Sequence, residues 1–73
     1  MSARPKHRKV LGDNLRRIRK DARLSQETLA EKADLHPVYV GEVERGVKNI
    51  SLDALVQIAG ALKIPAADLL GGI

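Results

Sequence analysis

The sequence predicts a single all-α domain built from five short helices. Its 73 residues suffice for one modest hydrophobic core and exclude a second domain. Apolar residues recur at helical spacing along the chain, and the segments that contain them begin or end at capping residues, namely Ser25, Pro37, Gly46 and Ser51. One tyrosine, with no phenylalanine or tryptophan, indicates an aliphatic core.

The first helix is predicted from about Lys9 to Ala22. Leu11, Leu15, Ile18 and Ala22 follow one another at positions i, i+4, i+7 and i+11, which is the spacing of an amphipathic helix. Arginine and lysine occupy its other faces. This helix is therefore expected to bury one apolar stripe and to expose a basic surface.

Residues 1–8 are predicted to form a mobile basic arm ahead of a folded domain spanning residues 9–73. The arm contains Pro5, several charges and little that a core could bury. It would become ordered only on a partner. The cations expected to contact phosphates or a minor groove are Arg4, Lys6, Arg8 and Lys9.

The next two helices are short and close together in the chain. The second is predicted from about Gln26 to Ala33, with Ser25 as its N-cap. The third is predicted from about Pro37 to Arg45, because proline fits the first helical position and Gly46 fits the left-handed position just past a helix end. Two short helices joined by a tight turn are the helix-turn-helix arrangement, whose second helix enters the major groove of DNA.

A fourth helix is predicted after Ser51, which is placed to cap it, and before Pro65, which interrupts it. Its expected apolar face is Leu52, Leu55, Ile58, Ala59 and Leu62. A short fifth helix is predicted in the AADLL segment, residues 66–70, and ends at the glycine pair 71–72.

The charge is distributed unevenly along the chain. The formal net charge is +4, but residues 1–23 carry nine Lys and Arg against two Asp, whereas residues 24–73 carry four against seven acids. Clustered cations are typical of a protein that binds nucleic acid or an anionic surface. A solvated segment that favours solubility is the alternative.

Several classes of function are disfavoured. The chain has no cysteine, and neither a metal site nor a cofactor is expected. No apolar run approaches the roughly 20 residues that cross a bilayer, and the N-terminus lacks the apolar stretch of a secretory signal, so residence in the cytoplasm, on the nucleoid, is expected. The chain has no nucleophile and base placed as in an enzyme, and it has no glycine-rich phosphate loop. Neither an enzyme nor a small-molecule site is therefore expected.

The stretch from Leu24 to Leu70 resembles the Cro/repressor (XRE-type) helix-turn-helix family, and especially the controller-type regulators of restriction-modification systems. The motifs are SQETLA at residues 25–30, ERG at 44–46 and SLDALVQIAGAL at 51–62. The resemblance implies a five-helix, lambda-repressor-like domain in which helices 2 and 3 form the helix-turn-helix. It also implies a homodimer that binds an inverted-repeat operator in double-stranded DNA and regulates transcription.

The resemblance assigns DNA contacts to particular residues. Gln26 takes the position that binds phosphate at the start of the motif. Groove-facing positions are held by His36, Pro37, Val38, Tyr39 and Glu42, and backbone-contacting positions by Arg45, Lys48 and Asn49.

Four of the groove-facing assignments have a simpler alternative. His36 and Val38 could be ordinary exposed residues, and Tyr39 could be a partly buried packing residue with its hydroxyl at the rim. Glu42 could exclude wrong base sequences or pair with a neighbouring arginine instead of accepting a hydrogen bond from cytosine. Gly41, inside the third helix, either permits a close approach to DNA or has no role.

Other residues are given structural roles. The resemblance implies an ion pair between Arg19 and Glu44 that orients the helices. Leu69, Leu70 and Ile73 are candidates for the dimer interface, closure of the monomer core being the alternative for the two leucines.

A second function stays open. The same fold could serve as a protein-interaction module, such as a DNA-binding antitoxin that holds a toxin partner. That function would require an additional partner-binding segment, and the chain offers only the basic arm for it. RNA binding is less well supported, because the aromatic platforms that stack unpaired bases are lacking.

Overall fold

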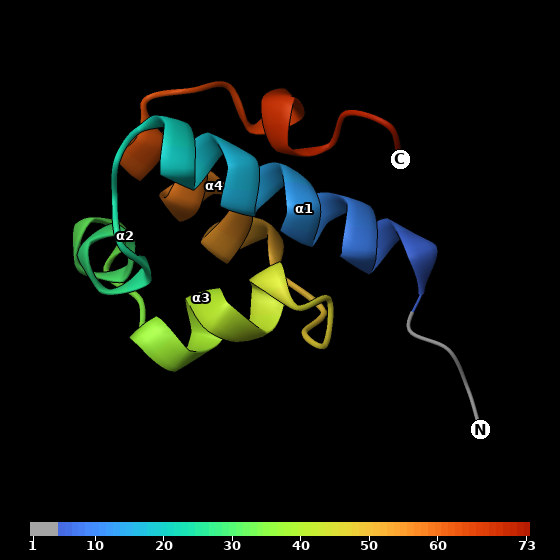
Figure 1. Cartoon of the computed structure of the whole chain (residues 1–73), viewed down its shortest axis with the longest axis horizontal. Helices are drawn as coiled ribbons and strands as arrows, with labels where there is room; N and C mark the ends of the chain where they lie inside the picture. Colours follow the sequence, from blue (N-terminus) through green and yellow to red (C-terminus); the bar gives the residue numbers. More distant parts are fainter. Residues whose placement is uncertain (1–4) are drawn as a thin grey trace.

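The computed structural model describes residues 5–73, which contain helices and no strands. The elements are α1 (Lys6–Asp21), α2 (Gln26–Ala33), α3 (Pro37–Glu44), α4 (Leu52–Leu62) and the 3-10 helix η1 (Ala66–Leu69). Figure 1 shows α1 running the length of the molecule, with α4 behind it and α3 below it. Helix α2 packs against both α3 and α4, and α1 packs against α3. Within this described part, no helix has the length and apolar character needed to span a membrane.

The core is aliphatic, as its composition predicts. Every α-helix contributes to it, and so does η1. The largest side chains with less than 2% exposure are Leu15, Leu29, Val40, Val43, Ile58 and Leu69. The expected face of α4 is buried except at its first residue, since Leu52 is 73% exposed. Its inclusion in the buried face was therefore wrong.

Local signals at the helix ends act as expected. The Ser25 hydroxyl accepts a hydrogen bond from the Thr28 N–H at 3.0 Å, and the Ser51 hydroxyl accepts one from the Ala54 N–H at 3.0 Å. Asp34 closes α2 in the left-handed conformation, with φ of 58°. Side chains that accept from the first-turn N–H groups explain why α2 and α4 begin where they do.

Helix α1 begins at Lys6, three residues before the predicted start. Lys6 and Arg8 are therefore helical, and the assignment of residues 6–8 to a flexible arm was wrong; residues 1–4, including Arg4, lie outside the described part. The physical reason is a close contact with the end of α3. A Cβ atom on Gly46 would lie 3.3 Å from the Lys9 Cα and 3.5 Å from the Arg8 carbonyl carbon, so this glycine lets the first turn of α1 pack there.

The C-terminal segment folds back on α1. The Asn14 side-chain amide donates to the carbonyl oxygens of Leu69 at 3.0 Å and Gly71 at 2.8 Å. The predicted fifth helix is a four-residue 3-10 helix, and Leu69 within it is only 1% exposed. Leu69 belongs to the monomer core, so its assignment to a dimer interface was wrong. Leu70 and Ile73 are 43% and 62% exposed.

Candidate nucleic-acid interface

Helix α3 has one face in the core and one in solvent. Val40 and Val43 are 0% and 1% exposed, whereas Val38, between His36 and Val40, is 59% exposed. His36 is exposed as well, and Pro37 and Glu42 are half-buried. The structure thus places four of the predicted groove-facing residues on α3 or at its start, outside the core.

His36 has a second task, because it is the N-cap of α3. Its Nδ1 atom accepts a hydrogen bond from the Val38 N–H at 3.1 Å. An imidazole whose Nδ1 is an acceptor carries its hydrogen on Nε2. His36 therefore fixes the start of α3 while retaining an Nε2–H donor that suits a guanine edge or a phosphate.

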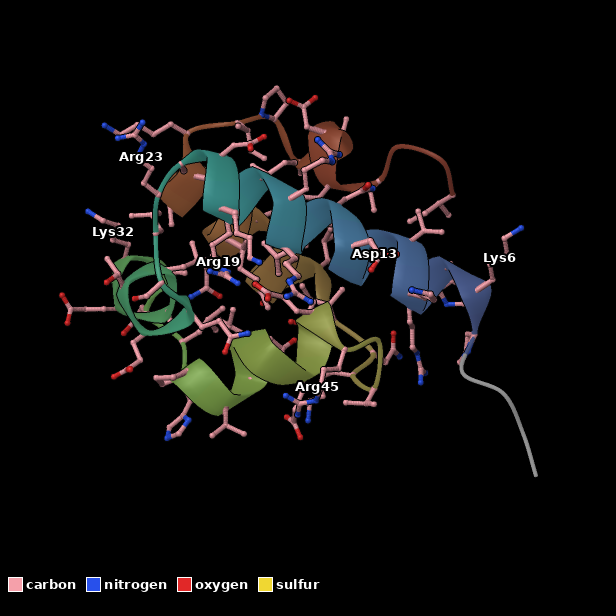
Figure 2. The ribbon with its side chains drawn as sticks, viewed as in Figure 1. Lys6, Asp13, Arg19, Arg23, Lys32 and Arg45 are labelled. Atoms are coloured by element: carbon pink, nitrogen blue, oxygen red, sulfur yellow. The ribbon has the colours of Figure 1, made fainter. Side chains whose placement is uncertain are left out.

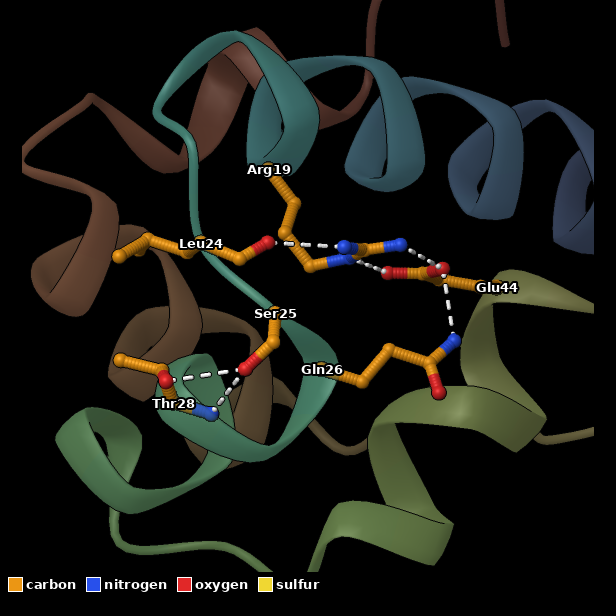
Figure 3. Close-up of polar contacts among 6 residues, drawn as sticks. All are labelled: Arg19, Leu24, Ser25, Gln26, Thr28 and Glu44. Carbon is orange, nitrogen blue, oxygen red and sulfur yellow. Dashed lines mark hydrogen bonds and ion pairs between the residues drawn. The ribbon is translucent and has the colours of Figure 1, made fainter.

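An ion pair joins α1 to α3 beneath this surface (Figure 3). The Arg19 Nε lies 2.6 Å from the Glu44 Oε2, and the Arg19 Nη2 donates to Oε1 at 3.0 Å. The Arg19 Nη1 also donates to the Leu24 carbonyl oxygen at 2.8 Å. The hydrogen bond with Glu44 raises the pKa of Arg19 above its ordinary value, whereas burial acts in the opposite direction and lowers it. The guanidinium consequently stays charged, and the pair that the resemblance implies is present.

The same carboxylate holds Gln26. The Gln26 Nε2 donates to the Glu44 Oε1 at 3.0 Å, which links the start of α2 to the end of α3 (Figure 3). Arg19, Glu44 and Gln26 therefore form one connected network across three helices. Because the network fixes the amide of Gln26, it also fixes the position of its Oε1 atom.

Gly41 makes room for this arrangement. A Cβ atom on Gly41 would lie 3.2 Å from the Arg45 Nη1 and 3.4 Å from the Gln26 Oε1. Both polar side chains thus lie across α3 at the point where it has no side chain. Beside them is a surface hollow of about 440 Å³, lined by Gln26, Glu27, Pro37, Val38, Gly41 and Arg45. Glu27 and Gly41 were not among the predicted site residues, and only the presence of glycine inside a short helix hinted at the latter.

Tyr39 lies at the rim of the surface. Its ring packs against the core, and its hydroxyl accepts a hydrogen bond from the Ser51 N–H at 3.3 Å. The Lys48 Nζ lies 5.5 Å from the centre of the ring, within the range of a cation–π contact. Tyr39 therefore holds the loop between α3 and α4 and orients Lys48.

Cations border α3 at its C-terminal end. Figure 2 shows Arg45 pointing away from α1, and Lys48 and Asn49 in the following loop are exposed. The first turn of α1 lies next to Gly46 and brings Lys9 to the same end, where it pairs with Asp13 at 3.1 Å. Over residues 5–73, no cluster of three His, Asp or Glu side chains could hold a metal ion.

These features define a class of protein. A short helix is fixed on a small aliphatic core, presents polar and apolar side chains outward, and has basic residues at its end. This is the arrangement by which small helical proteins place one helix against the edges of DNA base pairs and their cations against phosphates.

Comparison with known proteins agrees with that class. The helix-turn-helix family model matches residues 15–69. The chain is 42% identical to the control protein C.BamHI of Bacillus amyloliquefaciens over 64 residues, covering 86% of this chain and 79% of that protein. It is 41% identical to the control protein C.SmaI of Serratia marcescens, covering 86% and 75%.

Solved structures give the same result. The restriction-modification controller protein C.AhdI of Aeromonas hydrophila superposes with a TM-score of 0.84 at 44% identity, covering 85% of this chain and 94% of that one. The chain belongs to the helix-turn-helix family of the XRE type, whose members are DNA-binding regulators of transcription.

Proposed function

We propose that the chain is a sequence-specific regulator of transcription that binds an inverted-repeat operator as a homodimer, with α2 and α3 as its helix-turn-helix. The observation that carries this proposal is the division of α3 into a buried face at Val40 and Val43 and an outer face at His36 and Val38. The protein acts in the cytoplasm, on the nucleoid, and not as an enzyme.

Base readout is assigned to the N-terminal half of α3. The Nε2–H of His36 donates to a guanine acceptor, and Val38 packs on a thymine methyl group. Pro37 and Glu42 flank these contacts, and Glu42 favours cytosine or excludes other bases. Tyr39 acts by orienting Lys48 rather than by reaching into the groove, because its hydroxyl is already bonded to the Ser51 N–H.

Phosphate contacts are assigned to both sides of α3. On one side is the first turn of α2, where Gln26 lies and where the N–H groups before Thr28 have no intrahelical acceptor. On the other side, the contacts are assigned to residues that follow α3 and to the first turn of α1. They are Arg45, Lys48, Asn49, Lys6, Arg8 and Lys9, with Arg4 as a further contact from outside the described residues.

The proposal is tested by selecting binding sites for the purified protein from a random DNA duplex library. The expected product is an inverted repeat whose half-sites are about 34 Å apart, one turn of DNA, because a twofold dimer presents two recognition helices at that spacing. Affinity for the selected site is expected to fall steeply with salt, the logarithmic slope being about −0.9 per phosphate neutralised. DNA retention without an enriched motif, or a nearly flat salt dependence, contradicts the proposal.

Two substitutions at His36 separate its cap from its base contact. Asparagine is a good N-cap, so His36→Asn is expected to keep the stability of the domain, whereas His36→Ala is expected to lower it by roughly 1 kcal/mol. Both remove the imidazole donor, so both should weaken binding to the selected operator by about 1–3 kcal/mol and relax preference at one base pair. Urea unfolding and DNA titration measure the two effects. Unchanged base preference in His36→Asn would show that His36 is only a cap.

A further inference from the structure

The hollow of about 440 Å³ beside α3 has walls of two kinds. On the α3 side the wall is apolar, because Pro37 and Val38 line it and Val38 is 59% exposed. On the α2 side the wall is polar, with Gln26 and Glu27 at the start of that helix. The bases of DNA carry few apolar groups on their major-groove edges, so an apolar wall on a DNA-facing surface restricts which base fits the hollow.

The polar wall presents hydrogen-bond acceptors. The Gln26 Nε2 donates to the Glu44 Oε1 at 3.0 Å, which leaves the Gln26 Oε1 on the side of α3, 3.4 Å from the position of a Cβ atom on Gly41 (Figure 3). Glu27 is exposed, and an ionised carboxylate accepts hydrogen bonds but donates none. The group that fits this hollow therefore has an N–H donor beside an apolar group.

Few base edges combine these two features. Thymine carries a C5 methyl group beside the O4 acceptor, and cytosine carries the N4 amine donor without a methyl group. Adenine methylated on N6 and cytosine methylated on N4 keep their remaining N–H in the base pair, so they show a methyl group without a donor. In 5-methylcytosine the C5 methyl group lies next to an N4–H that is free in the groove. Among these bases, only 5-methylcytosine presents a donor and a methyl group side by side.

Arg45 offsets the charge of the carboxylate at this place. DNA phosphates repel acidic side chains, so Glu27 alone would weaken binding. The Arg45 Nη1 lies 3.2 Å from the position of a Cβ atom on Gly41, and its guanidinium borders the same hollow. A side chain at position 41 would occupy the space between Arg45 and Gln26. The glycine therefore keeps the hollow open between a cation and two acceptors.

We propose that this hollow binds the edge of 5-methylcytosine in the major groove, with Pro37 and Val38 against the methyl group and Glu27 accepting from the N4–H. The chain then binds its operator more tightly when one cytosine is methylated at C5, so DNA methylation regulates where it binds. This inference rests on the proposed function, which places Val38 on a pyrimidine methyl group, and deepens it by naming the base. Thymine supplies the methyl group but sets its O4 against the carboxylate, so it binds less tightly.

Base replacement in the selected operator tests the two contacts separately. Cytosine, 5-methylcytosine, uracil and thymine are placed in turn at each pyrimidine of the half-site, and the dissociation constant of the full chain is measured for every duplex. Cytosine and 5-methylcytosine differ only in the methyl group, as do uracil and thymine. At one position the methyl group is expected to tighten binding about fourfold in both pairs, which is the effect of burying one methyl group. At that position 5-methylcytosine is expected to bind about tenfold more tightly than thymine, because a charge-assisted hydrogen bond replaces a repulsion.

Two variants assign these contacts to side chains. Val38→Ala changes an exposed position, so the variant is expected to fold normally, to lose both methyl effects and to keep the preference for cytosine over uracil. Glu27→Gln places an amide that donates to O4 as well as accepting from N4–H, so it is expected to lose the preference for 5-methylcytosine over thymine and to keep both methyl effects. The matched controls are Val56→Ala on α4 and Glu31→Gln one turn further along α2, because both residues are exposed and lie outside the hollow. They are expected to leave every affinity ratio unchanged.

The outcomes separate this proposal from the proposed function. A library that yields no enriched sequence contradicts the sequence-specific regulator, and this inference with it. An enriched operator in which no methyl group changes the affinity overturns the 5-methylcytosine site alone, and so does a methyl effect that survives Val38→Ala. Thymine that binds as tightly as 5-methylcytosine, or a preference that Glu27→Gln leaves unchanged, overturns the assignment of the base. Separate loss of the two effects in the two variants, with both controls unchanged, supports the site.

Discussion

Replacing Gly12 by alanine is expected to destabilise the domain by about 1–3 kcal/mol. A Cβ atom at this position would lie 2.5 Å from the Glu44 carbonyl oxygen and 2.6 Å from that of Val43. Both are backbone atoms of α3, so no side-chain rotation relieves the overlap and the two helices must separate. For a domain of this size, each kcal/mol lowers the melting temperature by about 4–8 °C. Thermal and urea unfolding measure the loss.

Gly60 provides the matched control for this substitution. It is also a helical glycine, but a Cβ atom added to it meets nothing within 4 Å. Gly60→Ala is therefore expected to stabilise the monomer by up to about 1 kcal/mol through helix propensity. The same chemical change should thus act with opposite signs in α1 and α4. A similar response at both positions would show that α1 and α3 are not in close backbone contact at Gly12.

The displacement of α3 also has a functional consequence. Gly12 contacts the last residues of α3, so separating the helices tilts the outer face of α3 relative to α2 and its first turn. Binding to operator DNA is therefore expected to weaken in Gly12→Ala by more than the fraction of unfolded protein explains. DNA titration at a temperature where the variant is fully folded measures the loss of affinity that unfolding does not explain.

The helix boundaries that sequence predicts well are those set by local chemistry. Ser25 and Ser51 carry hydroxyls that bond N–H groups three residues ahead, and Pro37 already has the backbone angle of a first helical residue. The ends of α1 and α4 are different. Arg23 and Lys63 take φ of 61° and 57° in a region that favours glycine or asparagine, so nothing in their residue type announces them.

The residues of the candidate site also divide into those whose roles the sequence predicts and those whose roles it does not. The Arg19–Glu44 pair can be predicted from the sequence, since a motif position implies it, and the structure contains it. The groove-facing role of His36 rests on a motif position as well and stays a prediction. The contact of Gln26 with Glu44 and the space at Gly41 cannot be predicted, because they depend on which side chains meet after α2 and α3 have packed. The role of Leu69 could not be predicted from the sequence either, because an apolar residue near a chain end suits a core and an interface equally. Only the packing of η1 shows that Leu69 is buried in the monomer.

Breaking the ion pair from one side is expected to have the largest effect on stability. The side chains of Arg19 and Glu44 are only 10% and 4% exposed, so Arg19→Met leaves an uncompensated carboxylate in a buried position. Removing one partner of such a pair costs about 3–5 kcal/mol. A domain of 73 residues has little stability beyond that, so a large unfolded fraction is expected at 25 °C. Urea unfolding and the far-ultraviolet circular dichroism spectrum measure it.

The double substitution Arg19→Met with Glu44→Leu separates a buried-charge effect from lost packing. Replacing both partners of a buried pair by apolar residues is often neutral or stabilising, so most of the stability should return. DNA binding should not return with it, because Gln26 has lost the carboxylate that holds its amide. Lys9→Ala removes the exposed pair with Asp13 and should cost less than about 1 kcal/mol. If Arg19→Met destabilises the domain no more than Lys9→Ala does, the ion pair between Arg19 and Glu44 does not stabilise the packing of α1 against α3. If the double variant binds DNA as tightly as the parent, DNA binding does not depend on the position in which Glu44 holds the Gln26 amide.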